Sequence, residues 1–125
     1  MMNTSLLIFE SKERKATVTS PDIDNRYSKG VILTLDVTAV TSGASIVLSV
    51  DYKDEASGKY VSYFTGTAAV TTVSTNAYMI YPGVGAASGG ITETSPAGLP
   101  KTWRVKVTHA DDKAITYSVG ANLMI

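Results

Sequence analysis

The sequence predicts an all-β fold, a single-domain antiparallel β-sandwich of the Ig-like or jelly-roll-like kind with about eight strands. Thr, Ser and Val together make up roughly a third of the residues, a composition that favours strands over helices. Several segments alternate apolar and polar residues with a period of two, as side chains do along a half-buried strand. Turn-forming residues separate these segments at fairly regular spacing, and one long Gly- and Pro-rich loop interrupts them.

The chain is predicted to begin with an N-terminal arm, residues 1–14, and to continue as one sandwich domain, residues 15–125. The arm contains four consecutive apolar residues, Leu6, Leu7, Ile8 and Phe9. This run is too short to distinguish a strand from a helix by its period. A first strand is predicted over residues 16–20, and Pro21 ends it because proline has no amide hydrogen to donate to a sheet.

The centre of the sheet is predicted to be a hairpin of residues 30–40 and 45–53. One face of its first strand is apolar throughout: Val31, Leu33, Leu35, Val37 and Ala39. In the second strand the larger residues Ile46, Leu48, Val50 and Tyr52 alternate with Val47, Ser49 and Asp51. An amphipathic helix would need apolar residues at a 3.6 spacing and would not carry so many Val and Thr residues. The turn is expected at Ser42-Gly43, since glycine accepts the positive φ of a tight loop.

The strands that follow are read from the same alternation. Residues 59–65 are predicted to pair with residues 45–53 through a turn at residues 54–58. Two further strands are expected at residues 67–74 and 77–81.

A final hairpin is predicted between residues 102–109 and 114–125. In its first strand Trp103, Val105 and Val107 are expected to point into the core. The second strand carries six apolar residues on one face: Ile115, Tyr117, Val119, Ala121, Leu123 and Ile125.

Residues 82–100 differ from the rest of the chain. They contain five of the ten glycines and three of the four prolines, and Glu93 is their one charged residue. Loops beyond about 12–15 residues are uncommon in compact domains and are either functional or disordered. Two interpretations stay open: a flexible surface excursion, or an arm that orders against a neighbouring subunit.

Composition argues against several classes of function. The 11 basic residues balance 11 acidic ones, so no basic excess favours binding to nucleic acid or to an anionic membrane. Cysteine is absent, which removes disulfides, Cys-ligated metals and thiol nucleophiles. No apolar run reaches the ~20 residues of a spanning helix, and the first residues lack the features of a signal peptide. We expect a protein made and used without export by the general secretory route.

No catalytic constellation is predicted, and we expect a protein that is not an enzyme. A Ser-His-Asp triad would need His109, the only histidine, to face a serine, but we expect a solvent-facing turn residue beside Asp111 and Asp112. Asp36 and Asp51 would suit glycoside hydrolysis only across a cleft. We interpret them as solvated acids on adjacent strands.

Metal and cofactor sites are not predicted either. The acidic loop residues Asp22, Asp24 and Asn25 offer closely spaced oxygen ligands, as does Asp111-Asp112, but neither group has the spacing of a calcium loop. We interpret both as Asx turns. The Gly-rich residues 83–90 resemble a dinucleotide fingerprint, but no helix is expected after them.

The aromatic residues leave a carbohydrate-binding interpretation open, because exposed rings stack on sugars. The chain has seven tyrosines and one tryptophan, and we expect Trp103 in the core. Tyrosine is common both at interfaces and at sheet edges, so four tyrosines cannot be assigned from sequence: Tyr60, Tyr63, Tyr78 and Tyr81.

Five stretches together resemble a known group of proteins: residues 30–40, 54–60, 81–90, 99–109 and 115–121. The group is the small β-rich virion structural proteins of tailed bacteriophages, and the resemblance covers the chain from about Lys15 onward. Its motifs are structural rather than catalytic. The resemblance implies a capsid decoration (cement) or head-fibre-like protein, made in the host cytoplasm and located on the capsid surface of the virion. A tail or connector component is the alternative within the virion.

Such a protein is expected to bind the major capsid protein or another virion protein and to form a homo-oligomer, with a trimer as one possibility. The candidate assembly contacts lie in the arm and in the long loop: Leu6, Leu7, Ile8, Phe9, Tyr81, Pro82, Val84, Ile91, Pro96 and Leu99. The alternative function is that of a carbohydrate- or host-surface-binding module.

Overall fold

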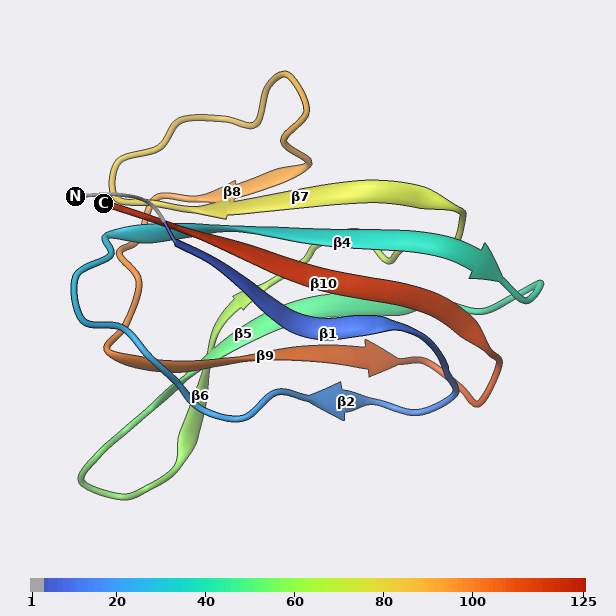
Figure 1. Cartoon of the computed structure of the whole chain (residues 1–125), viewed down its shortest axis with the longest axis horizontal. Helices are drawn as coiled ribbons and strands as arrows, with labels where there is room; N and C mark the ends of the chain where they lie inside the picture. The colour runs from blue at the N-terminus through green and yellow to red at the C-terminus, as the bar shows by residue number, and fades with distance from the viewer. Residues whose placement is uncertain (1–3) are drawn as a thin grey trace.

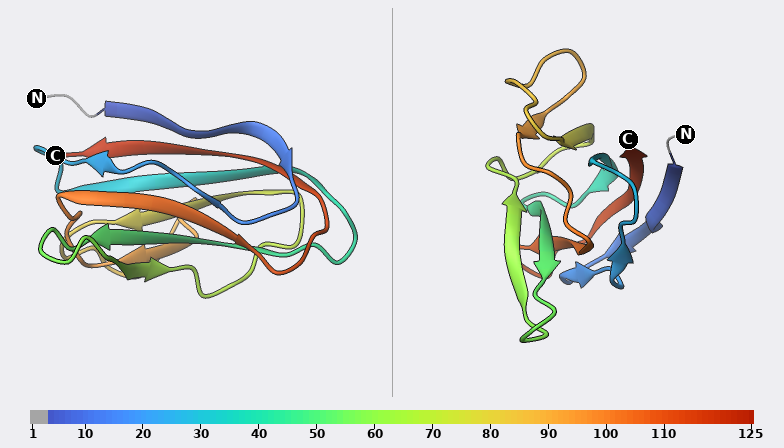
Figure 2. Two further views of the ribbon diagram at one scale, coloured as in Figure 1. Left: turned by 90° about the horizontal axis from the view of Figure 1, so that it is seen from below. Right: turned by 90° about the vertical axis from the view of Figure 1, so that its left-hand side faces the viewer.

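A computed structural model describes residues 4–125 of the chain. The described residues form two packed β-sheets and no helix, which confirms the predicted β-sandwich (Figure 1). Each sheet contains five strands. The two layers are seen from below and from one end in Figure 2.

Sheet A has the order β1-β10-β4-β7-β8. Its strands are β1 (Thr4–Arg14), β10 (Ile115–Met124), β4 (Gly30–Val40), β7 (Ser74–Ile80) and β8 (Glu93–Ser95). Neighbours are antiparallel except β7 and β8, which are parallel. The long antiparallel strands β10 and β4 therefore lie inside this sheet, and β1 forms one edge of it.

Sheet B has the order β2-β9-β5-β6, and β3 also pairs with β9. Its strands are β2 (Val18–Thr19), β3 (Ile23–Asp24), β9 (Thr102–His109), β5 (Ile46–Lys53) and β6 (Tyr60–Thr65). The sequence predicted a strand over residues 16–20, of which two residues pair. The predicted pairing of residues 45–53 with 59–65 is confirmed by β5 and β6.

The core lies between the two sheets and follows the predicted alternation. From sheet A it receives Val31, Leu33, Leu35, Val37, Tyr78, Ile80, Ile115, Tyr117, Val119 and Ala121, each at most 3% exposed. Sheet B contributes Ile46, Leu48, Val50, Trp103, Val105 and Val107, each at most 1% exposed. Burying a side chain of this size stabilises the fold by about 1.5–3 kcal/mol, so this interface dominates the stability of the chain.

Two predicted hairpins are wrong. β4 does not pair with β5, and β9 does not pair with β10; in both cases the two strands belong to opposite sheets. Residues 41–45 and 110–114 cross from one sheet to the other. In the first crossing Gly43 has a φ of 87°, and Ala44 is buried and donates its amide hydrogen to the Thr41 carbonyl over 2.9 Å. Strands that pair and strands that face each other show the same alternation, so the pattern could not separate the two arrangements.

The structure differs from three further predictions. The described part of the predicted arm forms β1 and pairs with β10 along its length, so residues 4–14 belong to the sheet, and residues 1–3 lie outside the described residues. Within the predicted strand 67–74, Val70 forms one isolated bridge with Ile46, and Ser74 begins β7. Ala39 and Ile125 are exposed instead of facing the core.

Candidate assembly surface

The predicted contacts in the first strand divide between core and surface. Phe9 is 7% exposed and belongs to the core, so the structure contradicts its assignment as a surface contact. Leu6 and Ile8 are partly buried against the same core. Leu7 is different because its side chain is 74% exposed, and it remains available to a partner.

The long loop is held to the rest of the chain by hydrogen bonds at both of its ends. Near its start, the Tyr81 hydroxyl donates to the Ile125 carbonyl over 3.0 Å. Near its end, the Leu99 amide donates to the Lys29 carbonyl over 2.9 Å, and the Leu99 side chain is buried. Leu99 is therefore a core residue and not a contact. The part between Tyr81 and β8 stands away from sheet A in Figure 1.

The other predicted contacts in the loop lie at its surface. Val84 and Ile91 are half-buried, whereas Pro82 and Pro96 are exposed. Within the loop, the Thr94 hydroxyl donates to the Gly85 carbonyl over 2.8 Å. At β8 the Glu93 carboxylate accepts a hydrogen bond of 2.9 Å from the Thr67 amide. The loop thus has defined hydrogen bonds within the chain and does not need a neighbouring subunit to form them.

The outer face of sheet A carries little charge except along the second half of β1, where Glu10, Lys12 and Glu13 are exposed. We call its central part, which leaves out this half of β1, the neutral face, and define it by outward-facing residues that come from all five strands. These are Ser5, Leu7, Ile32, Thr34, Asp36, Thr75, Ala77, Met79, Thr94, Ser118, Gly120, Asn122 and Met124. Asp36 is the one charged member, and its carboxylate accepts a hydrogen bond of 2.9 Å from the Thr75 hydroxyl.

The residues of the neutral face lie in rows across the strands. One row runs from Ser5 through Asn122 and Ile32 to Met79. The next runs from Leu7 through Gly120 and Thr34 to Ala77. Apolar and small polar side chains therefore alternate over a continuous surface.

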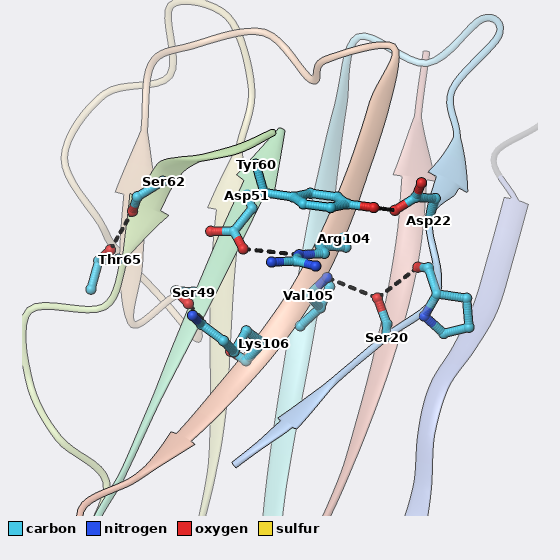
Figure 3. A network of polar contacts seen from close by, with 11 residues as sticks. Ser20, Asp22, Ser49, Asp51, Tyr60, Ser62, Thr65, Arg104, Val105 and Lys106 are labelled. Carbon is cyan, nitrogen blue, oxygen red and sulfur yellow. Dashed lines mark hydrogen bonds and ion pairs between the residues drawn. The ribbon is translucent and has the colours of Figure 1, made fainter. Parts of the chain in front are cut away.

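The outer face of sheet B is charged and cross-linked, as Figure 3 shows. The Arg104 guanidinium bonds to the Asp51 carboxylate over 3.0 Å and lies 3.5 Å from the centroid of the Tyr60 ring. The Tyr60 hydroxyl donates to Asp22 over 2.6 Å, and Lys53 forms an ion pair with Asp22 over 3.5 Å. These contacts join β6, β5 and β9 to the segment between β2 and β3, so they fix the edge of sheet B.

The electrostatics of this network follow from its hydrogen bonds. The bond from Tyr60 holds the pKa of Asp22 below its usual value of 3.8, with a smaller contribution from Lys53. The same bond raises the pKa of Tyr60 above its usual value of 10.0. Asp51 is 6% exposed, so it is not the solvated acid that the sequence suggested. Asp36 and Asp51 lie on opposite sheets rather than on adjacent strands, which removes them as a carboxylate pair.

His109 links the two sheets and is not the solvent-facing turn residue that we expected. Its Nε2 lies 2.8 Å from the hydroxyl of Tyr117, a fully buried residue of β10. Burial lowers the pKa of His109 below 6.5, the nearby Arg14 lowers it further, and Asp111 opposes them. The recorded partners of the His109 side chain are thus a tyrosine, an arginine and an aspartate, with no serine among them.

The remaining predicted site residues have structural contacts. Tyr78 is buried, which raises its pKa to about 12. Tyr63 packs edge-on against Tyr52 and donates its hydroxyl to the Gly98 carbonyl. Asn25 forms an Asx turn with Ser28, as predicted.

The described residues hold no group of three or more His, Asp or Glu side chains placed to bind a metal ion. Within residues 4–125, no helix is long and apolar enough to cross a membrane. The largest of the recorded concavities, about 690 Å³ in volume, is an open depression beside the loop of Asn25, Arg26 and Tyr27. Comparisons with known protein families, with curated proteins and with solved structures find no match to this chain.

Proposed function

We propose that this chain is a non-enzymatic structural protein of a tailed-phage virion. In this proposal it decorates or cements the outer capsid surface through contacts with copies of itself and with the major capsid protein. The virion context comes from the resemblance of residues 30–40, 99–109 and 115–121 to virion structural proteins. A role in assembly with other proteins is supported by the neutral face on the outer side of sheet A.

The observation that carries the proposal is the neutral face. The cores of protein–protein interfaces are depleted of charged residues and enriched in Met. The neutral face has one charged residue, Asp36, and two methionines, Met79 and Met124, and the charged second half of β1 lies beside it. A surface of this kind fits a protein whose work is contact with other proteins.

Binding to phage heads that lack their decoration protein tests the proposal. The purified chain should bind the heads saturably, with a copy number that matches the capsid lattice and a Thr34→Lys variant that binds at least tenfold more weakly. A Thr108→Lys variant, altered on the outer face of sheet B, is the matched control and should bind like the unaltered chain. Absence of saturable binding, or recovery of the protein in tails instead, would remove the capsid assignment.

A second candidate function is saccharide binding, and Tyr60 is the residue that favours it. One face of the Tyr60 ring is covered by Arg104, yet the residue remains 36% exposed. The ring is held in place at its hydroxyl by Asp22, and Asp22 and Lys53 offer an acceptor and a donor beside it. A fixed aromatic ring with hydrogen-bonding groups at its rim suits a sugar ring.

A glycan array tests this second candidate. A reproducible signal that Tyr60→Ala removes and Tyr27→Ala leaves unchanged would support it, because Tyr27 is 71% exposed but lies outside the network. Tyr78→Ala is not informative, since Tyr78 is buried. An array without reproducible signal would reject the candidate.

A further inference from the structure

We propose that residues 10–14 of β1 form an acid-sensitive latch, which detaches from β10 when His109 is protonated while the rest of the fold persists. We call these five residues the latch segment. The change goes beyond the function proposed above and does not depend on it. Its physical basis is a single arginine, Arg14, which lies between the edge of sheet A and the histidine of sheet B.

The latch segment has little buried surface. β1 lies at the edge of sheet A and pairs with β10 among the described strands. The pairing shifts register between Phe9 and Lys12, as it does at a β-bulge, and residues 10–13 are all exposed. Segments with few buried apolar contacts open locally at a low cost in free energy. Phe9 is buried, so the strand before the latch segment stays anchored in the core.

Arg14 holds the latch segment to β10. Its guanidinium donates to the carbonyls of Glu10 over 2.8 Å and Lys12 over 3.2 Å, and to the carbonyl of Tyr117 over 2.8 Å. The first two carbonyls belong to the latch segment and the third belongs to β10. The guanidinium carbon also lies 5.5 Å from the centroid of the Phe9 ring and 4.8 Å from that of Tyr117. Displacing Arg14 would therefore remove both the hydrogen bonds and the cation–π contacts that fix this segment.

His109 contacts the same tyrosine from sheet B. Its Nε2 lies 2.8 Å from the Tyr117 hydroxyl, and the two ring centroids are 5.7 Å apart. A charge on the imidazole would place two cations around one fully buried side chain, where like charges repel more strongly than in water. None of the ion pairs recorded for residues 4–125 includes Arg14, so no carboxylate in direct contact offsets this repulsion.

The groups that face His109 come from four elements. Those that carry charge or titrate are Arg14 of β1, Asp111 in the turn after β9, and Tyr117 of β10. Burial raises the pKa of Tyr117 to about 12, so this residue stays neutral. β5 and the segment before β2 place Ile46 and Thr17 beside His109, and neither of these titrates.

The direction of the pH effect follows from these groups. Burial lowers the pKa of His109 below 6.5, Arg14 lowers it further, and Asp111 raises it. Opening of the latch segment moves Arg14 away and exposes the imidazole to water. The pKa of His109 is therefore higher in the open form than in the closed form. As the pH falls below 6.5, proton binding favours the open form.

Amide hydrogen exchange followed by NMR tests this inference, with rates corrected for the intrinsic effect of pH. Between about pH 7.5 and about pH 5.5, the protection of the latch segment should fall at least about threefold relative to that of β4. β4 is the internal reference, because a general loss of stability would lower the protection of both strands. His109→Gln can still bond to the Tyr117 hydroxyl but does not titrate, so in this variant the ratio should not change with pH.

A second measurement tests the part played by the guanidinium. Arg14→Gln should raise the pKa of His109, read from the imidazole proton shifts, because it removes the charge that opposes protonation. Arg26→Gln is the matched control, since the Arg26 side chain is 76% exposed and pairs with Asp24, and should leave this pKa unchanged. A thermal melt of each variant confirms that it is folded.

Three results would overturn the inference. One is a latch segment whose protection falls no more than that of β4. Another is a His109→Gln variant that keeps the pH dependence of the unaltered chain. The third is an Arg14→Gln variant in which the pKa of His109 is unchanged, since the guanidinium would then not act on the imidazole.

Discussion

The outer faces of the two sheets are built on the same pleated framework and differ in what they carry. On sheet B, Arg104, Asp51 and Tyr60 contact one another, and Asp22 ties them to the adjacent segment (Figure 3). On sheet A, the neutral face presents small and apolar side chains with one charged residue, and the exposed Glu10 and Glu13 of β1 lie beside it. The charged side chains on sheet B contact one another within the chain. On sheet A the recorded contacts are hydrogen bonds between polar groups, such as the 2.7 Å bond from the Ser5 hydroxyl to Asn122.

This difference shows that burial of an outward residue depends on its neighbours rather than on its strand position. Asp36 and Asp51 occupy equivalent outward positions on long strands. Asp51 is buried because Arg104 lies beside it, and the Tyr60 ring lies over that guanidinium. Asp36 has only the hydroxyl of Thr75 as a recorded side-chain partner and remains partly exposed.

Removing the two acids should have unequal effects on stability. Asp51→Ala leaves the guanidinium of Arg104 partly buried without its carboxylate, and should lower the free energy of unfolding by about 1–3 kcal/mol. Asp36→Ala removes a hydrogen bond at a partly exposed position and should change it by less than about 0.5 kcal/mol. Urea denaturation of the two variants measures both values. Equal losses of unfolding free energy in the two variants would show that the acid on sheet B contributes no more to stability than the acid on sheet A.

A second comparison uses two exposed tyrosines. Tyr60→Ala removes the ring that covers Arg104 and should lower the melting temperature by about 2–4 °C. Tyr27→Ala removes a side chain that projects into solvent and should change it by less than about 1 °C. Differential scanning calorimetry checks this. A Tyr60→Ala variant that melts at the temperature of the unaltered chain would mean that the network does not stabilise the sheet.

The sequence predicted the strands and their inward faces well because both depend on local alternation. Trp103, Val105 and Val107 are fully buried, as their spacing required. The connections could not be predicted, since β4 followed by β5 has the same alternation whether the strands pair or face each other. The network on sheet B was also out of reach, because Asp22 and Tyr60 are far apart in the sequence.

The exposure of the candidate contact residues was predicted in part. Leu7 is exposed as expected, whereas Phe9 and Leu99 complete the core of their own chain. The identity of an apolar residue near a sheet edge or in a loop does not show whether its side chain packs into the core of the chain or stays exposed at the surface. The neutral face was readable only after the strands of sheet A were known to be neighbours, since its residues come from five separate segments.

His109 provides a test of the contact between the two sheets. The folded state lowers its pKa below 6.5, so the unfolded chain binds the proton first as the pH falls. The stability that comes from the neutral imidazole is complete above pH 6.5 and is lost as the pH falls from 6.5 through the folded-state pKa. The charged groups near the ring are Arg14, which opposes protonation, and Asp111, which favours it.

His109→Gln should remove this part of the pH dependence, because glutamine does not titrate and can still bond to the Tyr117 hydroxyl. Urea denaturation between about pH 5 and pH 8 gives the slope of stability against pH for both proteins. The unaltered chain should lose stability more steeply below pH 6.5 than the variant does. Identical slopes would mean that His109 is as easily protonated in the folded state as in the unfolded one.

The smallest expected effect is that of salt on self-association. If copies of the chain meet through the neutral face, which itself carries one charge, raising NaCl from about 50 to 500 mM should change the self-association constant by less than about twofold. A contact through the outer face of sheet B would respond more strongly, since Arg104 and Lys106 would lie in it. Sedimentation equilibrium at the two salt concentrations measures this, and a change of tenfold would indicate a charged interface.

The central claim is that protein contacts are made by the outer face of sheet A and not by that of sheet B. An amide NMR dilution series from about 20 to 800 µM tests it most directly. Shifts and line broadening that increase with concentration should appear at Ile32, Thr34, Gly120 and their neighbours on sheet A, while Asp51 and Arg104 stay unchanged. Concentration-dependent changes on sheet B, with sheet A unaffected, would contradict the account.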